Sequence, residues 1–215
     1  LEDGRVVMFR PDVHAARFLR NADRMMMPGM TAEELVRIYE EVVRANWDFV
    51  PGPGSARIYL APGLRASKNL LGVVPNPGFI FTCVASPVGA IFAKKPLDLC
   101  VDRDFHRAAK GGTGNINAAG NYGPVLRVTA AVQGRGFDDS LFLDNEDEYV
   151  REQRASNSFF VTSDGVLCTP PLSHEILDGV TRDSILEVAR ELVEEGKLKG
   201  VREGEIPVTE LKNMR

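Results

Sequence analysis

The segment at residues 110–124 has a composition that would let the backbone approach a small ligand closely. It contains four glycines between positions 111 and 120, interleaved with asparagines, and it ends in Gly120-Asn-Tyr-Gly-Pro124. Glycine has no side chain to hold a bound group away from the peptide. The same composition also suits a long surface turn, so the loop alone leaves both interpretations open.

Two further segments carry groups that suit a phosphate. Thr169-Pro-Pro-Leu172 is followed by Gly179-Val-Thr-Arg182, which leads into a predicted helix. The free N–H groups and positive dipole end of a helix N-terminus favour an anion. Thr181 could add its hydroxyl to a phosphate or could simply cap the helix. Arg24 offers a guanidinium fork that matches phosphate geometry, although a single surface arginine is usually only solvated.

The elements that must position these groups follow from hydrophobic spacing and capping residues. Thr31-Ala-Glu-Glu34 has the form of a capping box and precedes apolar residues at helical spacing, which predicts a helix over about 32–46. A second helix is predicted over 181–195, with Gly196 as its stop. Shorter patterns predict strands at 5–9, 55–60, 78–84 and 140–144, an apolar segment that suits a helix at 124–133, and a hairpin from 157–162 and 165–168.

Composition excludes several classes of function. The formal net charge of −4 and the pI near 5.5 give no overall cationic surface for nucleic acid. The sequence has no apolar run of about 18 residues that would span a membrane. Three dispersed cysteines argue against a disulfide framework and favour a reducing compartment, the cytoplasm, with mitochondria as the alternative. No Cys-x-x-Cys or His-Glu-x-x-His pattern occurs, so no metal site is expected.

Several motifs follow one another in order along nearly the whole chain. They are Asn21-Ala-Asp-Arg-Met25, Gly111-Gly-Thr-Gly114, Gly120-Asn-Tyr-Gly-Pro124, Thr169-Pro-Pro-Leu172 and Leu177-Asp-Gly-Val-Thr-Arg182. In this order they resemble the branched-chain amino acid aminotransferases, which are fold-type IV enzymes dependent on pyridoxal 5′-phosphate. The family reaction transfers an amino group from valine, leucine or isoleucine to 2-oxoglutarate.

The resemblance implies a fold as well as an activity. The expected fold class is α+β, with two α/β subdomains and the cofactor site at their interface. The small N-terminal subdomain would cover residues 1–95, and the larger cofactor-binding subdomain would cover residues 96–215. Both ends look truncated, because the family's N-terminal segment and its C-terminal Ser-Gly-Thr-Ala loop have no counterpart here.

The resemblance also implies a role for individual residues. Arg24, with Val180 and Thr181, would bind the cofactor phosphate, and Tyr122 would hydrogen-bond the phenolic oxygen. Glu152, in an acid–asparagine motif with Asn157, would pair with the ring nitrogen and keep it protonated. The substrate pocket is expected to be lined by Phe9, Tyr59, Ala61 and Ala155. From the residues alone, Tyr122 could equally be a half-buried core tyrosine and Glu152 one of several solvated acids.

One departure from the family pattern affects its central chemistry. The family's Schiff-base lysine lies five residues before the motif tyrosine, and that position is Asn117 here. An amide side chain cannot form an imine or shuttle a proton. Lys110 is the only lysine in the loop and lies seven residues before Asn117, so it would need a rearranged loop to substitute.

Two further departures concern the substrate. Ala61 replaces the arginine of the family's Tyr-x-Arg-Pro segment, which should weaken recognition of the second substrate's carboxylate. The family's Glu-x-Gly-Thr-x-Asn becomes Glu152-Gln-Arg-Ala-Ser-Asn157. This change removes a glycine and a hydroxyl and places the bulky Arg154 beside the cofactor.

Three hypotheses remain from the sequence. The first is a branched-chain aminotransferase-like protein that is a pseudoenzyme or a repurposed enzyme, with pyridoxal 5′-phosphate held without covalent attachment. The second is an ordinary branched-chain aminotransferase whose lysine has been mutated. The third is a non-catalytic partner subunit of an active homologue. The expected ligand is a small amino acid or keto acid, and the expected assembly is a homodimer, since family members dimerise.

Overall fold

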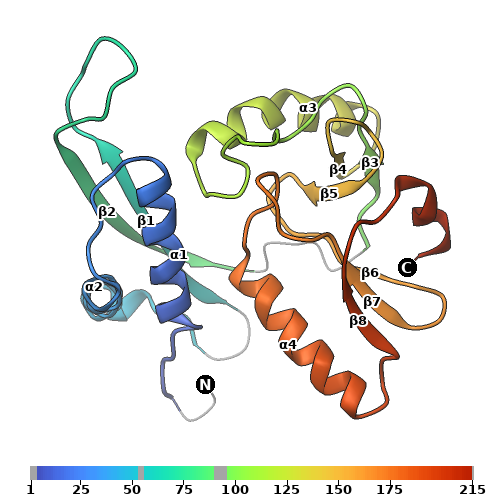
Figure 1. The fold of residues 1–215 in the computed structure, drawn as a ribbon. Coiled ribbons are helices and arrows are strands. Elements are labelled where there is room, and N and C mark those ends of the chain that lie inside the picture. Colours follow the sequence, from blue (N-terminus) through green and yellow to red (C-terminus); the bar gives the residue numbers. More distant parts are fainter. Residues whose placement is uncertain (1–3, 53–55, 90–95, 215) are drawn as a thin grey trace. The chain divides into compact units, whose positions relative to one another are not determined.

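The computed structural model describes residues 4–52, 56–89 and 96–214. The chain divides into two compact units, Leu1–Lys95 and Pro96–Arg215 (Figure 1). Each unit has its own buried apolar cluster. The residues with candidate chemistry are therefore distributed over two separately packed bodies.

The first unit combines two helices with a long β-hairpin. Its elements are α1 (Pro11–Arg24), α2 (Ala32–Ala45), the short 3-10 helix Trp47–Phe49, β1 (Arg57–Ala66) and β2 (Phe79–Val88). Helix α2 begins with the expected capping box, in which the Thr31 hydroxyl accepts from the Glu34 amide at 3.2 Å and the Glu34 carboxylate accepts from the Thr31 amide at 2.8 Å. Ala15, Leu35 and Tyr39 form the buried centre, and the rings of Phe18 and Phe81 meet edge to face.

The strand predicted at residues 5–9 is wrong. Residues 5–8 have no regular structure, and Arg10 has a positive φ of 46° that turns the chain into α1. A strand needs a hydrogen-bonding partner, and the strands of this unit, β1 and β2, pair with each other. Pro11 occupies the first turn of α1, where its fixed φ and missing N–H cost nothing.

The predicted strands at 55–60 and 78–84 are confirmed as β1 and β2, but both are longer than expected. The two strands are antiparallel, with Tyr59 opposite Ser86 and Ala61 opposite Val84. Exposure alternates along each strand, so one face packs toward the helices through Leu60, Phe81 and Cys83. Tyr59 and Ala61 belong to the other, exposed face. Ser55, at the start of the predicted strand, lies outside the described residues.

The second unit contains two three-stranded sheets. The first has the order β3-β4-β5 and the second the order β6-β7-β8. Helix α3 (Gly123–Gly134) packs on β4, and helix α4 (Val180–Glu194) packs on β8 (Figure 1). The strands are β3 (Leu99–Val101), β4 (Asp139–Leu143), β5 (Val150–Gln153), β6 (Phe160–Val161), β7 (Val166–Thr169) and β8 (Gly200–Glu203).

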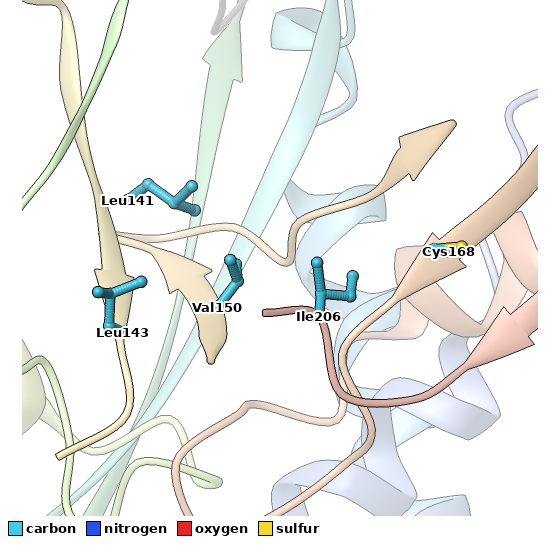
Figure 2. Packing of buried hydrophobic residues seen from close by; sticks show 5 residues of the cluster. All are labelled: Leu141, Leu143, Val150, Cys168 and Ile206. Atoms are coloured by element: carbon cyan, nitrogen blue, oxygen red, sulfur yellow. The ribbon is translucent and has the colours of Figure 1, made fainter. Parts of the chain in front are cut away.

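One apolar core joins the two sheets of this unit. Figure 2 shows its five buried side chains pointing into the same space, and they come from β4, β5, β7 and the segment after β8: Leu141, Leu143, Val150, Cys168 and Ile206. The Val150 amide also donates to the Ile206 carbonyl at 2.9 Å. The strand β5, which carries the candidate Glu152, is therefore fixed by both packing and backbone hydrogen bonds.

Most elements predicted for this unit are confirmed. The hairpin of β6 and β7 turns at Gly165, which has φ +89°, and α4 ends before Gly196, which has φ +73°. The helix at 124–133 and the strand at 140–144 correspond to α3 and β4. The parallel strand β8 was not expected, because a strand of only four residues in a charged tail leaves no periodic pattern.

Candidate functional site

A buried carboxylate lies at the centre of the second unit's polar contacts. Glu152 is on β5, and its side chain is 3% exposed. Its Oε1 atom lies 2.5 Å from Nη1 of Arg107, whose side chain is 5% exposed, and also accepts from the Leu177 amide at 3.3 Å. Its Oε2 atom accepts from Nδ2 of Asn157 at 2.9 Å. Glu152 is therefore not a solvated acid, and the acid–asparagine motif is a direct hydrogen bond.

Burial and these partners act on Glu152 in opposite directions. Burial raises the pKa of Glu152 to about 7, because the charged form loses its water. Arg107 opposes this rise most strongly, followed by the Leu177 amide, Asn157 and Arg182. The carboxyl group therefore changes charge close to neutral pH, and its ionised form depends on the arginine beside it.

Asn157 connects this carboxylate to the start of α4. Besides Glu152, its Nδ2 donates to the Leu177 carbonyl at 2.8 Å. A Cβ atom added at Gly179 would collide with Oδ1 of Asn157, so a glycine is required for the segment to pass this closely. Glu152, Asn157 and Gly179 are therefore packed against one another, with Asn157 between the other two.

Helix α4 begins directly after this contact. Its N-cap is Gly179, which provides no side-chain cap, and Val180 and Thr181 are its first two residues. Thr181 therefore does not cap the helix, which removes that interpretation of its hydroxyl. The amides of a first helical turn have no acceptor within the helix. This end of α4 presents an exposed Thr181 side chain at the positive end of the helix dipole, where an anion is favoured.

Arg182, the last residue of the Gly-Val-Thr-Arg motif, has a structural role. Arg182 is buried and donates from Nη2 to the Pro170 carbonyl and to Oε2 of Glu203, both at 2.9 Å. It thereby connects the Thr-Pro-Pro-Leu loop to α4 and β8. The two sequence motifs that looked separate are joined by this one side chain.

The glycine-rich loop is braced from within. Asn121 is buried, and its Nδ2 donates to the carbonyls of Thr113 at 2.7 Å and Ile116 at 2.8 Å, while its Oδ1 accepts from the Thr113 hydroxyl at 2.7 Å. Gly114 packs so tightly that an added Cβ would meet the side chain of Ala108 and lie 2.8 Å from the His174 carbonyl. The loop is therefore more than a loose surface turn.

This bracing presents Asn117 and Tyr122 together. The Tyr122 hydroxyl donates to Oδ1 of Asn117 at 2.8 Å. Asn117 is exposed and Tyr122 is half-buried. Lys110, also exposed, precedes Gly111, whose amide is anchored to Nδ1 of His174 at 3.2 Å. The loop therefore offers an amide and a phenol, in contact, at the two positions that the sequence resemblance singled out.

The other predicted site residues are distributed over both units. Ala155 lies exposed just after β5 in the second unit. Four more belong to the first unit, all exposed: Phe9 before α1, Arg24 in the last turn of α1, and Tyr59 and Ala61 on β1. The second unit alone brings together Asn117 with Tyr122, and Glu152 with Asn157 and the start of α4.

Arg107 is the residue that sequence reasoning missed. It lies between β3 and α3 in a segment without regular structure, and a lone arginine there carries no pattern. Its contacts come from distant parts of the chain, so no local spacing could have found it. The one available signal was chemical, since a buried carboxylate requires a cation or several donors.

Comparison with known proteins shows the family to which this chain belongs. The family profile described as amino-transferase class IV matches residues 1–215. The chain belongs to the class IV aminotransferase family. It is 38% identical over 191 residues to branched-chain-amino-acid aminotransferase 5, chloroplastic, of Arabidopsis thaliana, a match that covers 88% of this chain and 46% of that protein. The chain spans about half the length of the curated relatives it matches.

Solved structures of branched-chain amino acid aminotransferases share its fold. The branched-chain amino acid aminotransferase of Escherichia coli superposes with a TM-score of 0.80 at 28% identity, covering 96% of this chain and 66% of the other. The branched-chain amino acid aminotransferase of Thermobaculum terrenum, solved in its pyridoxal-phosphate form, gives 0.75 at 26% identity, covering 94% and 63%. The expected fold-type IV architecture is thereby confirmed.

Proposed function

We propose that this class IV aminotransferase chain is a branched-chain aminotransferase-like protein that holds pyridoxal 5′-phosphate without covalent attachment and does not transaminate by the lysine route. The observation that carries the proposal is Asn117, an amide hydrogen-bonded to Tyr122 at the position where the family pattern has lysine. An amide nitrogen is neither nucleophilic nor basic, so it can form no imine and take no proton.

The residues of the second unit fit this cofactor. The buried Glu152 carboxylate, charged beside Arg107, suits a protonated ring nitrogen. The start of α4, with the Thr181 hydroxyl, suits the phosphate. The Tyr122 hydroxyl suits the phenolic oxygen. When bound, the cofactor supplies an electron sink to an attached amino acid.

The chain's own residues would divide the work as follows. Glu152 would hold the ring nitrogen protonated, Tyr122 would orient the ring, and the start of α4 would anchor the phosphate. Asn117 could not move the proton between the substrate carbon and the cofactor, because its amide is not basic. Substrate recognition would be altered as well. Ala61 has no charge with which to bind the second substrate's carboxylate. Arg154 forms an ion pair with Asp139, in which Nε lies 3.4 Å from Oδ2.

The test of this proposal is a search for a covalent link in the unaltered chain. After incubation with pyridoxal 5′-phosphate and reduction with borohydride, tryptic mass mapping should find no stoichiometric adduct on the 110–124 loop. Spectrophotometry should show no absorbance change specific to valine or leucine. A stoichiometric adduct on Lys110 would overturn the proposal. Equilibrium dialysis of samples that have not been reduced would show whether the cofactor is retained non-covalently.

A homodimer is also part of this proposal, and an exposed apolar tip supports it. The turn of the β1–β2 hairpin carries Leu70, Leu71, Val73 and Val74, of which Leu71 and Val73 are fully exposed, at 101% and 107%. A contiguous apolar group on the surface usually meets a partner, and a second copy of this chain would bury it. This surface would equally serve a non-catalytic subunit that pairs with an active homologue.

We expect the double substitution Leu71→Ser and Val73→Ser to weaken self-association at least tenfold, as measured by sedimentation velocity over a concentration series. The removal of two large apolar side chains from an interface lowers the hydrophobic driving force for association. Leu126→Ser, at an exposed leucine on α3, is the matched control and should leave the association constant unchanged. Identical sedimentation of all three proteins would exclude the hairpin tip as the interface.

The compartment remains a proposal based on cysteine chemistry. All three cysteines are free, two of them buried, which suits a reducing environment such as the cytoplasm. The similar Arabidopsis protein described above is named as chloroplastic. Within the described residues, no helix is both long and apolar enough to cross a bilayer.

A further inference from the structure

We infer that Arg107 is a positioning residue that favours the ionised form of Glu152 and orients this carboxylate to bind the ring nitrogen of the cofactor. The inference rests on the proposed cofactor binding and assigns a role to a residue outside the sequence motifs. Arg107 would act through Glu152, because its ion pair and its hydrogen bonds join it to that carboxylate and to backbone carbonyls.

The geometry around Arg107 leaves it little freedom. Its Nη1 atom lies 2.5 Å from Oε1 of Glu152 and also donates to the carbonyls of Glu175 at 3.3 Å and Gly114 at 3.5 Å. Its Nε atom donates to the Arg154 carbonyl at 3.3 Å. A guanidinium held by three backbone carbonyls is preorganised, so the carboxylate meets a fixed charge.

The same contacts place Arg107 between the functional segments of the unit. Gly114 belongs to the loop that carries Asn117 and Tyr122, and Glu175 lies two residues before Leu177, which donates to Glu152. Arg154 follows β5 directly. One cation therefore connects the loop, the strand with the carboxylate, and the segment that leads into α4.

The burial of the Glu152 carboxylate makes a neighbouring cation necessary. A carboxylate as buried as Glu152 would be neutral over much of the physiological range without a compensating charge. Two positive groups face it: Arg107 from the segment before α3, and Arg182 from α4. The neutral donors are the Leu177 amide and Asn157. Arg107 lowers the pKa of Glu152 more than any of the others, against the rise caused by burial.

A pH dependence of binding follows from this arrangement. The ring nitrogen and the Glu152 carboxylate compete for a proton, so affinity should fall as pH falls through the pKa of Glu152. When Arg107 is neutralised, the pKa of Glu152 rises, and the midpoint of this fall should move to higher pH. A nearby opposite charge typically shifts a carboxyl pKa by about one to three units, so a similar displacement of the midpoint is expected.

The experiment measures binding of 4′-deoxypyridoxine 5′-phosphate to the full chain by isothermal titration between about pH 5.5 and 9. This probe keeps the ring nitrogen, phenol and phosphate but has no aldehyde, so it cannot react with surface lysines. Arg107→Gln should raise the midpoint by at least about one pH unit and weaken binding about tenfold at pH 7. Arg107→Lys, which keeps the charge but loses the fork, should keep the midpoint near that of the unaltered chain.

Two controls separate this role from a merely structural one. Arg151→Gln removes an arginine on the same strand, 11% exposed, that pairs with Asp144, Glu175 and Glu205, so it should lower the melting temperature without moving the midpoint. Glu152→Gln should abolish the pH step. If Arg107→Gln does not fold, Arg107→Met, which also removes the charge, takes its place and should raise the midpoint by the same amount.

The outcomes distinguish two kinds of failure. If the unaltered chain binds the probe but Arg107→Gln leaves the midpoint unchanged, or shifts it no more than Arg151→Gln does, Arg107 is structural and the inference is wrong. If the unaltered chain does not bind the probe at any pH, the proposed function fails, and the inference falls with it.

Discussion

Replacing Asn117 with lysine is expected to convert this chain into one that attaches pyridoxal 5′-phosphate covalently. Asn117 lies in a braced loop and accepts a hydrogen bond from Tyr122, so a lysine there would place an amine next to the phenol. A primary amine forms an imine with the aldehyde, which an amide cannot do. Borohydride reduction followed by mass mapping should then find about one adduct per chain, on the peptide that contains position 117.

The same substitution tests how much chemistry was lost with that one residue. A positioned general base contributes about 10²–10⁴-fold in rate, so the half-reaction with valine or leucine should rise by a factor in that range. The second half-reaction, with 2-oxoglutarate, should stay poor, because Ala61 replaces an arginine of the family pattern. Full turnover from Asn117→Lys alone would instead favour an ordinary aminotransferase whose lysine had been mutated.

A matched control uses the same loop. Ala119→Lys adds an ammonium two residues away, at an exposed position that begins the short 3-10 helix Ala119–Tyr122. It should give only the background labelling of a surface lysine. Equal labelling of the two variants would mean that position 117 has no special access to the cofactor, and the correspondence with the family lysine would be lost.

The sequence predicted the candidate site wherever the relevant contacts follow local motifs. Glu152 and Asn157 lie five residues apart, and the turn after β5 brings them into a direct hydrogen bond. Asn117 and Tyr122 have the same separation and are joined in the same way. In both pairs the partners are close in the chain and belong to one family motif, so the resemblance singled out both members of each pair.

Contacts between distant segments could not be predicted in this way. Arg107 meets Glu152, which is 45 positions further along, and Glu175, which is 68 positions away. Such a pairing depends on how β5 and the segment before α4 fold onto each other. The strand predicted at 5–9 was wrong for another reason: its apolar residues look like a strand, but no partner strand is available to them among the described residues. Here tertiary context decides the structure.

The sequence singled out Gly114 without indicating its structural role. Gly114 was noticed because glycine-rich loops approach ligands closely, whereas the structure gives it a packing role. An added Cβ there would lie 2.8 Å from the His174 carbonyl and 2.9 Å from the Glu175 Cα. Both neighbours are backbone atoms of the segment that leads into α4, so neither can move aside as a flexible side chain could.

We therefore expect Gly114→Ala to destabilise the chain by about 1–3 kcal/mol, the usual cost of overpacking a closely packed site. The loop would have to move away from residues 174 and 175, which would break the contact between the Gly114 carbonyl and Arg107. Urea unfolding followed by circular dichroism measures the change in the free energy of unfolding. Gly120→Ala is the control, because nothing lies within 4 Å of a Cβ at that position.

The effect of Gly114→Ala should extend from stability to chemistry. In the Asn117→Lys background it should lower the yield of the covalent adduct, because the loop that presents position 117 is displaced. Gly120→Ala, within the same motif, should change the free energy of unfolding by no more than about 0.5 kcal/mol and leave that yield intact. Equal stability of the two alanine variants would show that the loop yields easily at Gly114, and then packing could not be what holds Asn117 in place.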